Sequence, residues 1–207
     1  MITIIDYDTG NVGSIKNMIE YLGFNDVEIS SDENRILNST HLILPGIGSF
    51  DEGMKNLEKK GLDKIIREYA IKLKKPLLGI CLGMQLLGLS SEEGTKPGLG
   101  LIPFHSIKFR LNNGLKVPHM GWNTIFIKQP ESPLLKEMNN DYRFYFVHSY
   151  HAVTDDSSHV LLTSDYGYEF VVGICEGNVY GVQFHPEKSH KFGMKLMQNF
   201  LEINHVQ

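Results

Sequence analysis

The sequence predicts an α/β fold with an open, mostly parallel central sheet covered by helices on both faces, and added antiparallel strands in the second half. Two observations predict it. Short apolar runs alternate with helical patterns through the first half of the 207 residues, and short runs of strand character dominate the second half. No repeat, low-complexity stretch or linker divides the chain, so we expect one domain over residues 1–207.

The first half supplies the parallel part of the sheet. Residues 2–6 form a short apolar run, typical of a buried strand. Residues 11–22 then place Val12, Ile15 and Ile19 on one helical face, and Gly23 ends the pattern. Continuing along the chain, we expect strands at 27–30, 41–44 and 76–80, and helices at 62–73 and 82–89.

The second half is richer in strands. Strands are predicted at 106–110, 124–127, 143–147, 160–164, 170–175 and 179–184. A last helix carries Phe192, Leu196 and Phe200 at a spacing of four residues. The Gly- and Pro-rich residues 94–103 are expected to form a loop within the domain.

Composition argues against several classes of function. The net charge of −4 and pI of about 6.1 do not suggest a nucleic-acid or membrane-binding protein. The nine histidines show no zinc-site spacing, so neither a metal nor another cofactor is expected. No signal peptide or membrane-spanning run is apparent, and two cysteines do not make a disulfide framework, so a cytoplasmic location is expected.

Cys81 lies where a predicted strand turns into a predicted helix, in the sequence Gly-Ile-Cys-Leu-Gly of residues 79–83. This is the spacing of a nucleophile elbow with Cys in place of Ser. The start of the helix favours a thiolate, and the N–H of Leu82 would be free to bind an oxyanion. An isolated cysteine is more often a buried, inert side chain, as we expect for Cys175. The elbow therefore needs a partner base.

His185 and Glu187 provide that base and its orienting group. His185 follows the predicted strand 179–184, and Pro186 stops the strand pairing. Glu187 is close enough in sequence to accept a hydrogen bond from the imidazole. Each residue alone is readily explained as a strand-end or surface group. With Cys81, they give a nucleophile, a general base and an orienter.

The elbow with Met84 and Gln85, together with Phe-His-Pro-Glu at residues 184–187, resembles class I (triad) glutamine amidotransferases, whose fold is flavodoxin-like. Five further segments, in order along nearly the whole chain, are similar to the glutaminase subunits of imidazole glycerol phosphate synthase. They are Asp6-Tyr7 with Gly10-Asn11, and residues 45–50, 117–123, 146–150 and 185–189.

The resemblance implies hydrolysis of glutamine to glutamate and ammonia through a thioester on Cys81, with His185 and Glu187 completing the triad. It also implies a set of residues that bind glutamine or form the oxyanion hole: Gly46, Ile47, Gly48, Leu82, Gln85, Glu93, Ser149 and Tyr150. The loop 45–48 is expected to offer an oxyanion N–H after a peptide rearrangement, which its glycines allow.

The resemblance further implies a separate synthase (cyclase) subunit, a (β/α)8 barrel, which forms a heterodimer with this chain and receives the ammonia for histidine biosynthesis. The residues assigned to that interface or to an ammonia gate are Asn11, Met120, Trp122, Asn123, Tyr145, His148 and Lys188. Core packing is the ordinary role for Trp122 in its predicted turn, and a half-buried strand is the ordinary setting for Tyr145 and His148.

Two segments depart from the usual family pattern: Gly88-Leu89-Ser90 after the elbow helix, and residues 102–107. Such departures are compatible with a paralogue that supplies ammonia for surface-polysaccharide sugar amidation. A non-catalytic flavodoxin-like binding module and a hydrolase or peptidase of the same fold are further alternatives. The intact triad argues against the module, and Gln85 with Ser149-Tyr150 favours glutamine over a peptide.

Overall fold

The computed structural model describes residues 1–112 and 114–204. The range 1–207 predicted for the domain thus includes residues 113 and 205–207, which lie outside the described residues. Within the described part of the chain, eleven strands form one sheet and two further strands form a second. No helix in that part is long and apolar enough to cross a membrane.

The parallel half of the large sheet has the strand order β2-β1-β3-β4-β13. These strands are β1 (Ile2–Ile5), β2 (Val27–Ser30), β3 (His41–Leu44), β4 (Leu77–Ile80) and β13 (Val179–Val182), each parallel to its neighbours in this row. Strands 27–30 and 41–44 were predicted with these bounds. The predicted mostly parallel centre is confirmed.

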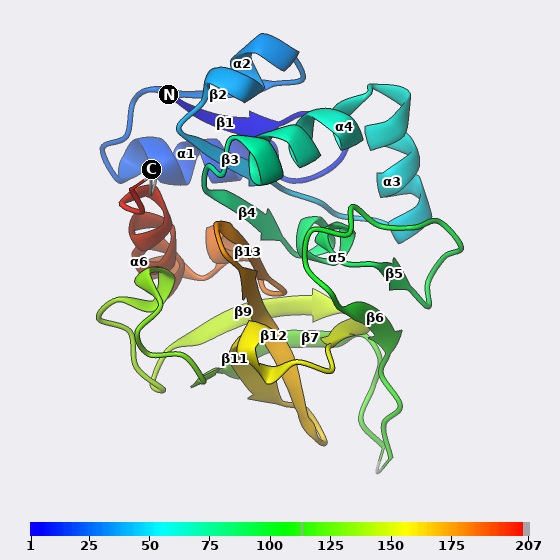
Figure 1. Cartoon of the computed structure of the whole chain (residues 1–207). Coiled ribbons are helices and arrows are strands. Elements are labelled where there is room, and N and C mark those ends of the chain that lie inside the picture. The colour runs from blue at the N-terminus through cyan, green and yellow to red at the C-terminus, as the bar shows by residue number, and fades with distance from the viewer. Residues whose placement is uncertain (113, 205–207) are drawn as a thin grey trace.

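Helices cover both faces of this half, as Figure 1 shows. Helices α1 (Val12–Tyr21) and α6 (His190–Leu201) pack on one face, where Ile15 and Phe200 belong to the same apolar cluster. The opposite face carries α2 (Glu33–Asn38), α3 (Phe50–Lys59), α4 (Leu62–Arg67) and α5 (Leu82–Leu87). Adjacent strand residues therefore serve different clusters: Ile4 joins the first and Ile5 the second.

Antiparallel strands extend the sheet beyond β13 through β12 (Glu169–Glu176), β10 (Tyr150–Val153) and β6 (His105–Lys108). β5 (Ser90–Ser91) follows, while β11 (Val160–Asp165) and β8 (Phe126–Ile127) pair to one side. The second sheet joins β7 (His119–Thr124) to β9 (Arg143–His148). In Figure 1 these added strands occupy the lower half of the molecule.

Several predicted boundaries were wrong. The strand predicted at 179–184 ends at Val182, so Gln183 and Phe184 lie between it and His185. Trp122 lies within β7 rather than in a turn. The helix predicted at 62–73 continues beyond α4 as a π-helical turn, Glu68–Lys72. Helices α2 and α3 were not predicted, because they are short or, in the case of α3, largely charged.

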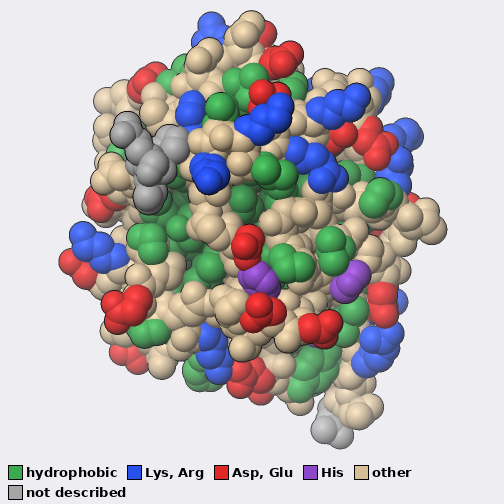
Figure 2. All heavy atoms as spheres, viewed as in Figure 1, with side chains coloured by type: hydrophobic (Ala, Val, Ile, Leu, Met, Phe, Trp, Pro, Cys, Tyr) green, Lys and Arg blue, Asp and Glu red, His purple; other side chains and the backbone are tan. Residues whose placement is uncertain are grey.

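The face of the molecule drawn in Figure 2 mixes both signs of charge. Blue basic and red acidic side chains are interspersed there with green hydrophobic groups. That view matches the small net charge of the sequence.

Candidate active site

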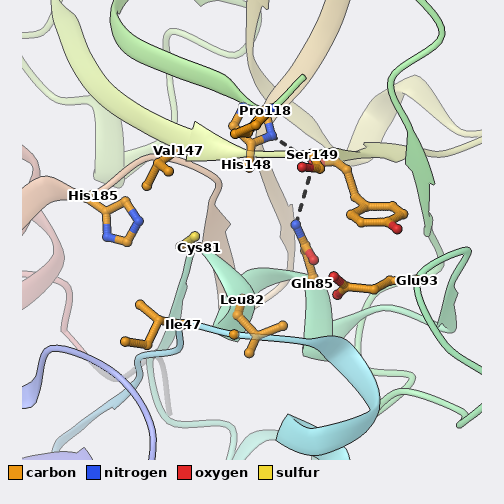
Figure 3. A pocket seen from close by; sticks show the side chains of 12 residues that line it. Ile47, Cys81, Leu82, Gln85, Glu93, Pro118, Val147, His148, Ser149 and His185 are labelled. Carbon is orange, nitrogen blue, oxygen red and sulfur yellow. Dashed lines mark hydrogen bonds between the residues drawn. The ribbon is translucent and has the colours of Figure 1, made fainter. Parts of the chain in front are cut away.

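A pocket of about 310 Å³ lies at the carboxyl ends of β4 and β13. Its walls come from the loop after β3, the elbow and start of α5, the loop after β5, the segment before β7, the end of β9 with β10, and the segment after β13. The residues that line it are Ile47, Gly48, Cys81, Leu82, Gln85, Glu93, Pro118, Val147, His148, Ser149, Tyr150 and His185. Ligand crevices of open α/β sheets form at this strand edge, and Figure 3 shows these side chains around the Cys81 sulfur.

Cys81 occupies a backbone conformation that few side chains adopt. Its φ is 55° and its ψ is −111°, and the residue joins β4 directly to α5. The N–H of Cys81 donates to the Val182 carbonyl at 2.8 Å, which ties the turn to β13. The Leu82 N–H, in the first turn of α5, has no carbonyl partner within the helix. Nucleophile and oxyanion donor are thus adjacent.

The elbow glycines are required by close backbone approach. A Cβ on Gly83 would lie 1.9 Å from the Leu44 carbonyl oxygen, and one on Gly79 would lie 2.8 Å from the Gly83 backbone. A Cβ on Gly46 would meet the Tyr7 hydroxyl at 2.5 Å. Because glycine has no side chain at these positions, β3, β4 and α5 can pack closely beneath Cys81.

His185 and Glu187 form a buried pair beside the sulfur. Nδ1 of His185 bonds Oε1 of Glu187 at 2.9 Å, and both side chains are almost inaccessible to solvent. Burial lowers the pKa of His185, but interactions with Cys81 and Glu187 outweigh it and raise the pKa to about 10. Nε2 of His185 has no hydrogen-bond partner among the described residues, so it is available to a substrate in the pocket.

Ser189 fixes the backbone of this pair. Its hydroxyl donates to the His185 carbonyl at 2.6 Å and accepts from the Tyr145 N–H at 3.0 Å. The His185 N–H in turn donates to the Tyr145 carbonyl at 3.0 Å. Strand β9 therefore supports the imidazole, and the 3-10 turn Pro186–Lys188 orients Glu187 beneath it.

The chain from residue 3 to 203 matches the family model described as glutamine amidotransferase class-I. The chain belongs to the class I glutamine amidotransferase family. A protein of Methanococcus maripaludis is 54% identical over 98% of this chain and 99% of its own length, and one of Pseudomonas aeruginosa is 47% identical over 98% and 100%. Both are named imidazole glycerol phosphate synthase subunit HisH 2. Sulfurimonas denitrificans has a 43% identical HisH that aligns over 100% of both chains.

Solved structures support the same fold. A crystal structure of a glutamine amidotransferase has a TM-score of 0.73 at 18% identity, covering 98% of each chain. The structure of PurLQS from Thermotoga maritima has a TM-score of 0.71 at 21% identity, covering 97% of this chain and 96% of that one. The protein is a glutamine amidotransferase of the HisH family with the expected α/β architecture.

The residues expected to bind glutamine gather at the pocket, with one exception. Ile47, Gly48, Leu82, Gln85, Glu93, Ser149 and Tyr150 line it. Gly46 instead lies buried beneath the loop, against Tyr7 and α5. Oε2 of Glu93 accepts the Phe50 N–H at 2.8 Å, so the first turn of α3 holds this carboxylate at the rim.

The loop 45–48 is held in its present conformation by Thr9, which sequence reasoning missed. The Thr9 hydroxyl donates to the Ile47 carbonyl at 2.5 Å and accepts from the Ile47 N–H at 3.4 Å. The Ile47 N–H is therefore engaged with Thr9, away from the pocket. Gly48 has a φ of +98°, a conformation that favours glycine, and Ile47 is 52% exposed.

The residues assigned to a partner face or an ammonia gate divide into two groups. Met120 and Trp122 point outward from β7, 61% and 45% exposed, and Lys188 lies 5.9 Å above the Tyr145 ring. Asn11 precedes α1, which contacts the 3-10 turn Pro186–Lys188. His148 is buried and lines the pocket, and the half-buried Asn123 bonds His119, which in turn bonds His148.

The two departures from the usual family pattern lie against each other. A Cβ on Gly88 would meet the Phe104 ring at 2.8 Å, and the Leu89 N–H donates to the Phe104 carbonyl at 2.8 Å. Ser90 Oγ and His105 Nδ1 are 2.8 Å apart. The small residue after α5 thus accommodates the large one before β6.

Sequence reasoning also missed Pro118, Val147 and His119, which line or support the pocket, and Gln183, which contacts Cys81. A buried glutamine between Val182 and Phe184 was the available signal for the last. Among the described residues no cluster of three or more His, Cys, Asp or Glu could hold a metal ion. Cys175 is half-buried, and burial raises its pKa to about 11, as expected of an unreactive thiol.

Proposed function

We propose that Cys81, His185 and Glu187 are the catalytic triad of a glutaminase, and that the freed ammonia passes to a separate synthase subunit. The observation that carries the triad is the buried His185–Glu187 pair at 2.9 Å beside the strained Cys81 elbow. A cysteine nucleophile, an imidazole and an orienting carboxylate form the standard set for acyl transfer.

The first half-reaction acylates Cys81. The thiolate attacks the side-chain carbonyl carbon of glutamine, and the carbonyl oxygen becomes an oxyanion beside the Leu82 N–H. His185, as imidazolium, donates its proton to the amide nitrogen as the C–N bond breaks. Ammonia leaves and a glutamyl thioester remains on Cys81.

The second half-reaction hydrolyses the thioester and regenerates free Cys81. Neutral His185 takes a proton from water, whose oxygen attacks the thioester carbonyl, and Cys81 departs as thiolate. Glutamate is released, so glutamine and water give glutamate and ammonia. Glu187 keeps the imidazole in place through both steps by accepting from Nδ1.

Glutamine binding follows from the charges at the rim. Glu93 is the carboxylate that would pair with the substrate α-ammonium, while Gln85, Ser149 and Tyr150 line the same side. Gly48 and Ile47 close the opposite side, where Thr9 engages the Ile47 peptide. An oxyanion contact from Ile47 therefore requires the loop to rearrange, and we infer that glutaminase activity is slow without the partner.

The partner is a synthase (cyclase) subunit with a (β/α)8 barrel, joined as a heterodimer in the cytoplasm. The subunit names of the relatives support a separate partner subunit. The exposed Met120 and Trp122 on β7 offer a surface for it, because β7 pairs with β9, whose Val147 lines the pocket. Asn11, Tyr145 and Lys188 complete the proposed face, with His148 and Asn123 behind it. The product of the assembly would serve histidine biosynthesis.

A second candidate pathway is favoured by one observation. Two of the most similar relatives are each named subunit HisH 2, and we take this number as a sign that the subunit occurs in a second copy. A second copy can serve another acceptor, such as a sugar amidated for a surface polysaccharide. Deletion of the gene separates the two: histidine auxotrophy supports the first pathway, and an altered polysaccharide with prototrophy supports the second.

The activity itself is tested with the purified chain and its synthase partner. Glutamate release is measured for the wild type alone, the wild type with partner, and Cys81→Ala with partner. We expect slow, fast and undetectable turnover, respectively. Wild-type rates in Cys81→Ala would refute the triad, and equal rates with and without the partner would refute the inference about the loop.

A further inference from the structure

A fully buried side-chain amide lies against the Cys81 sulfur. Gln183 follows β13 and has no solvent exposure, and its neighbours Val182 and Phe184 are buried and apolar. Burying an amide without partners costs about 2 kcal/mol or more. The Gln183 amide is therefore expected to form specific hydrogen bonds that offset this cost.

The direction of those bonds is set by a single carbonyl. The Tyr150 carbonyl oxygen can only accept, and it lies 3.5 Å from Nε2 of Gln85. The second hydrogen on that nitrogen then points to Oε1 of Gln183, 3.0 Å away. Nε2 of Gln183 consequently faces Cys81, with 3.8 Å between the nitrogen and Sγ. An amide nitrogen only donates, so the sulfur is the acceptor.

The same carbonyl also accepts a hydrogen bond from His148, which is itself bonded to His119. Nδ1 of His148 lies 2.7 Å from the Tyr150 oxygen and must donate, and Figure 3 shows this bond with that from Gln85. Nε2 of His148 then accepts from Nδ1 of His119 at 3.0 Å, and Nε2 of His119 accepts from Asn123 at 3.2 Å. Asn123 is itself fixed by the Asp165 carbonyl at 2.8 Å.

These histidines are uncharged at neutral pH. Burial lowers the pKa of His148 to about 3 and that of His119 to about 4. Each nitrogen in the row from Asn123 to Tyr150 therefore has one role, donor or acceptor. The polar chain is defined as Asn123, His119, His148, the Tyr150 carbonyl, Gln85 and Gln183. Its two arms meet at the Tyr150 carbonyl, which accepts from both His148 and Gln85, and the second arm donates onward from Gln85 through Gln183 to Cys81.

We propose that the Gln183 amide donates a hydrogen bond to the Cys81 thiolate and is a further catalytic residue of this enzyme. A hydrogen bond to an ionised acceptor is about twice as strong as one to a neutral acceptor, so this donor stabilises the thiolate over the thiol. It would also fix the direction from which the sulfur attacks. The proposal rests on Cys81 being the nucleophile of the proposed function.

Gln183 acts beside other groups near the sulfur. His185 lies next to Cys81, and Tyr7 is close enough for the charge of Cys81 to help raise the pKa of its hydroxyl. Burial raises the pKa of Tyr7, so its hydroxyl stays protonated and donates to the Pro45 carbonyl. His185 must give up its proton in each cycle, whereas the Gln183 amide keeps its own. The amide thus supports the sulfur throughout.

The test is the pH dependence of Cys81 alkylation in the complete chain. Iodoacetamide modification is followed on the peptide that contains Cys81, which separates it from Cys175. Gln183→Met keeps the side-chain length and removes the donor. We expect its alkylation midpoint about one pH unit above wild type, and about ten-fold slower alkylation below both midpoints. An unchanged midpoint in folded Gln183→Met would overturn the proposal.

Asn199→Leu provides the matched control. Asn199 is also a buried amide, but it lies on α6 and donates to the Leu134 and Lys136 carbonyls, remote from Cys81. Its loss should lower thermal stability and leave the alkylation midpoint in place. A midpoint shift of the same size in this control would show that general loosening, rather than a lost donor, causes the effect.

A measurement on the wild type covers the case in which Gln183→Met does not fold. The side-chain amide NMR signal of Gln183 should shift with pH at the midpoint of Cys81 alkylation and stay fixed in Cys81→Ala. A wild-type signal that does not respond would contradict the proposal. Neither experiment uses glutamine, so both can fail or succeed independently of the glutaminase assay.

Discussion

The two sides of the glutamine pocket are built differently. On the buried side, Cys81 sits above the crowded contacts of Gly83 and Gly79, and its surroundings are strands β4 and β13 with the polar chain behind them. On the open side, Ile47 is 52% exposed, Gly48 has free space around it, and Thr9 supplies hydrogen bonds to the Ile47 peptide. The nucleophile is therefore fixed in advance, whereas the loop that faces it can change.

The strongest loss of activity is expected on the buried side, from a substitution that removes the orienting carboxylate. Glu187→Gln keeps the shape of the side chain but cannot hold an imidazolium by charge. We expect turnover with the synthase partner to fall about 1,000-fold with little change in thermal stability. Steady-state glutaminase kinetics measure it. Near-wild-type turnover would remove Glu187 from the catalytic triad.

The second prediction compares a glycine from each side. Gly83→Ala forces a Cβ against the Leu44 carbonyl, and we expect a loss of about 3 kcal/mol or more in the free energy of unfolding. Gly48→Ala meets no atom and adopts an unfavourable φ, which should cost about 1 kcal/mol. Urea unfolding of both variants measures the difference. Equal losses would mean that the elbow is no more tightly packed than the loop.

The third prediction uses the buried histidines. The pKa values of His148 and His119 are lowered in the folded state, to about 3 and about 4, so the unfolded chain binds more protons below its pKa of about 6.5. The contribution of each to stability is complete above pH 6.5 and is lost as the pH falls, by about 1 kcal/mol at pH 5.5.

Chemical unfolding between pH 7.5 and 5 measures this loss. His119→Gln, which cannot take up a proton, should show a shallower decline than wild type. Parallel curves for the two proteins would show that His119 is not kept neutral by folding.

The smallest expected effect concerns the open side. Thr9→Val keeps the shape and removes the hydroxyl that engages the Ile47 peptide. Since one such bond contributes about 1 kcal/mol, the glutaminase rate of the isolated chain should rise about five-fold. Thr40→Val is the control, because it removes a similar bond, to the Met1 carbonyl, away from the pocket. No rise in Thr9→Val would show that Thr9 does not restrain the loop.

The same division explains what could be predicted from sequence. The strands under the elbow were predicted because each is a short apolar run, and the elbow because its glycines flank Cys81 at fixed spacing. β7 and β10 were missed because polar residues interrupt them: Asn123 and His151 are directed at interior partners that only the fold supplies. The hydrogen bond between His185 and Glu187 joins residues two positions apart, so it could be proposed from the sequence.

Contacts over long sequence distances could not be anticipated. Thr9 reaches Ile47 because β1 and β3 are neighbours, and Gln183 reaches Gln85 because β13 inserts beside β4. Gln183 was visible as a polar residue in an apolar run, but its partner was not. The strand order of the sheet, absent from any local pattern, decides both contacts.

The proposed chemistry passes through a thioester between Cys81 and glutamine, and this intermediate can be trapped. The enzyme with its synthase partner is mixed with glutamine and quenched in acid, and the mass of the peptide containing Cys81 is measured. We predict a glutamyl adduct on that peptide which hydroxylamine removes and Cys81→Ala lacks. Rapid glutamate release with no adduct on Cys81, or an adduct on Cys175 instead, would contradict the account.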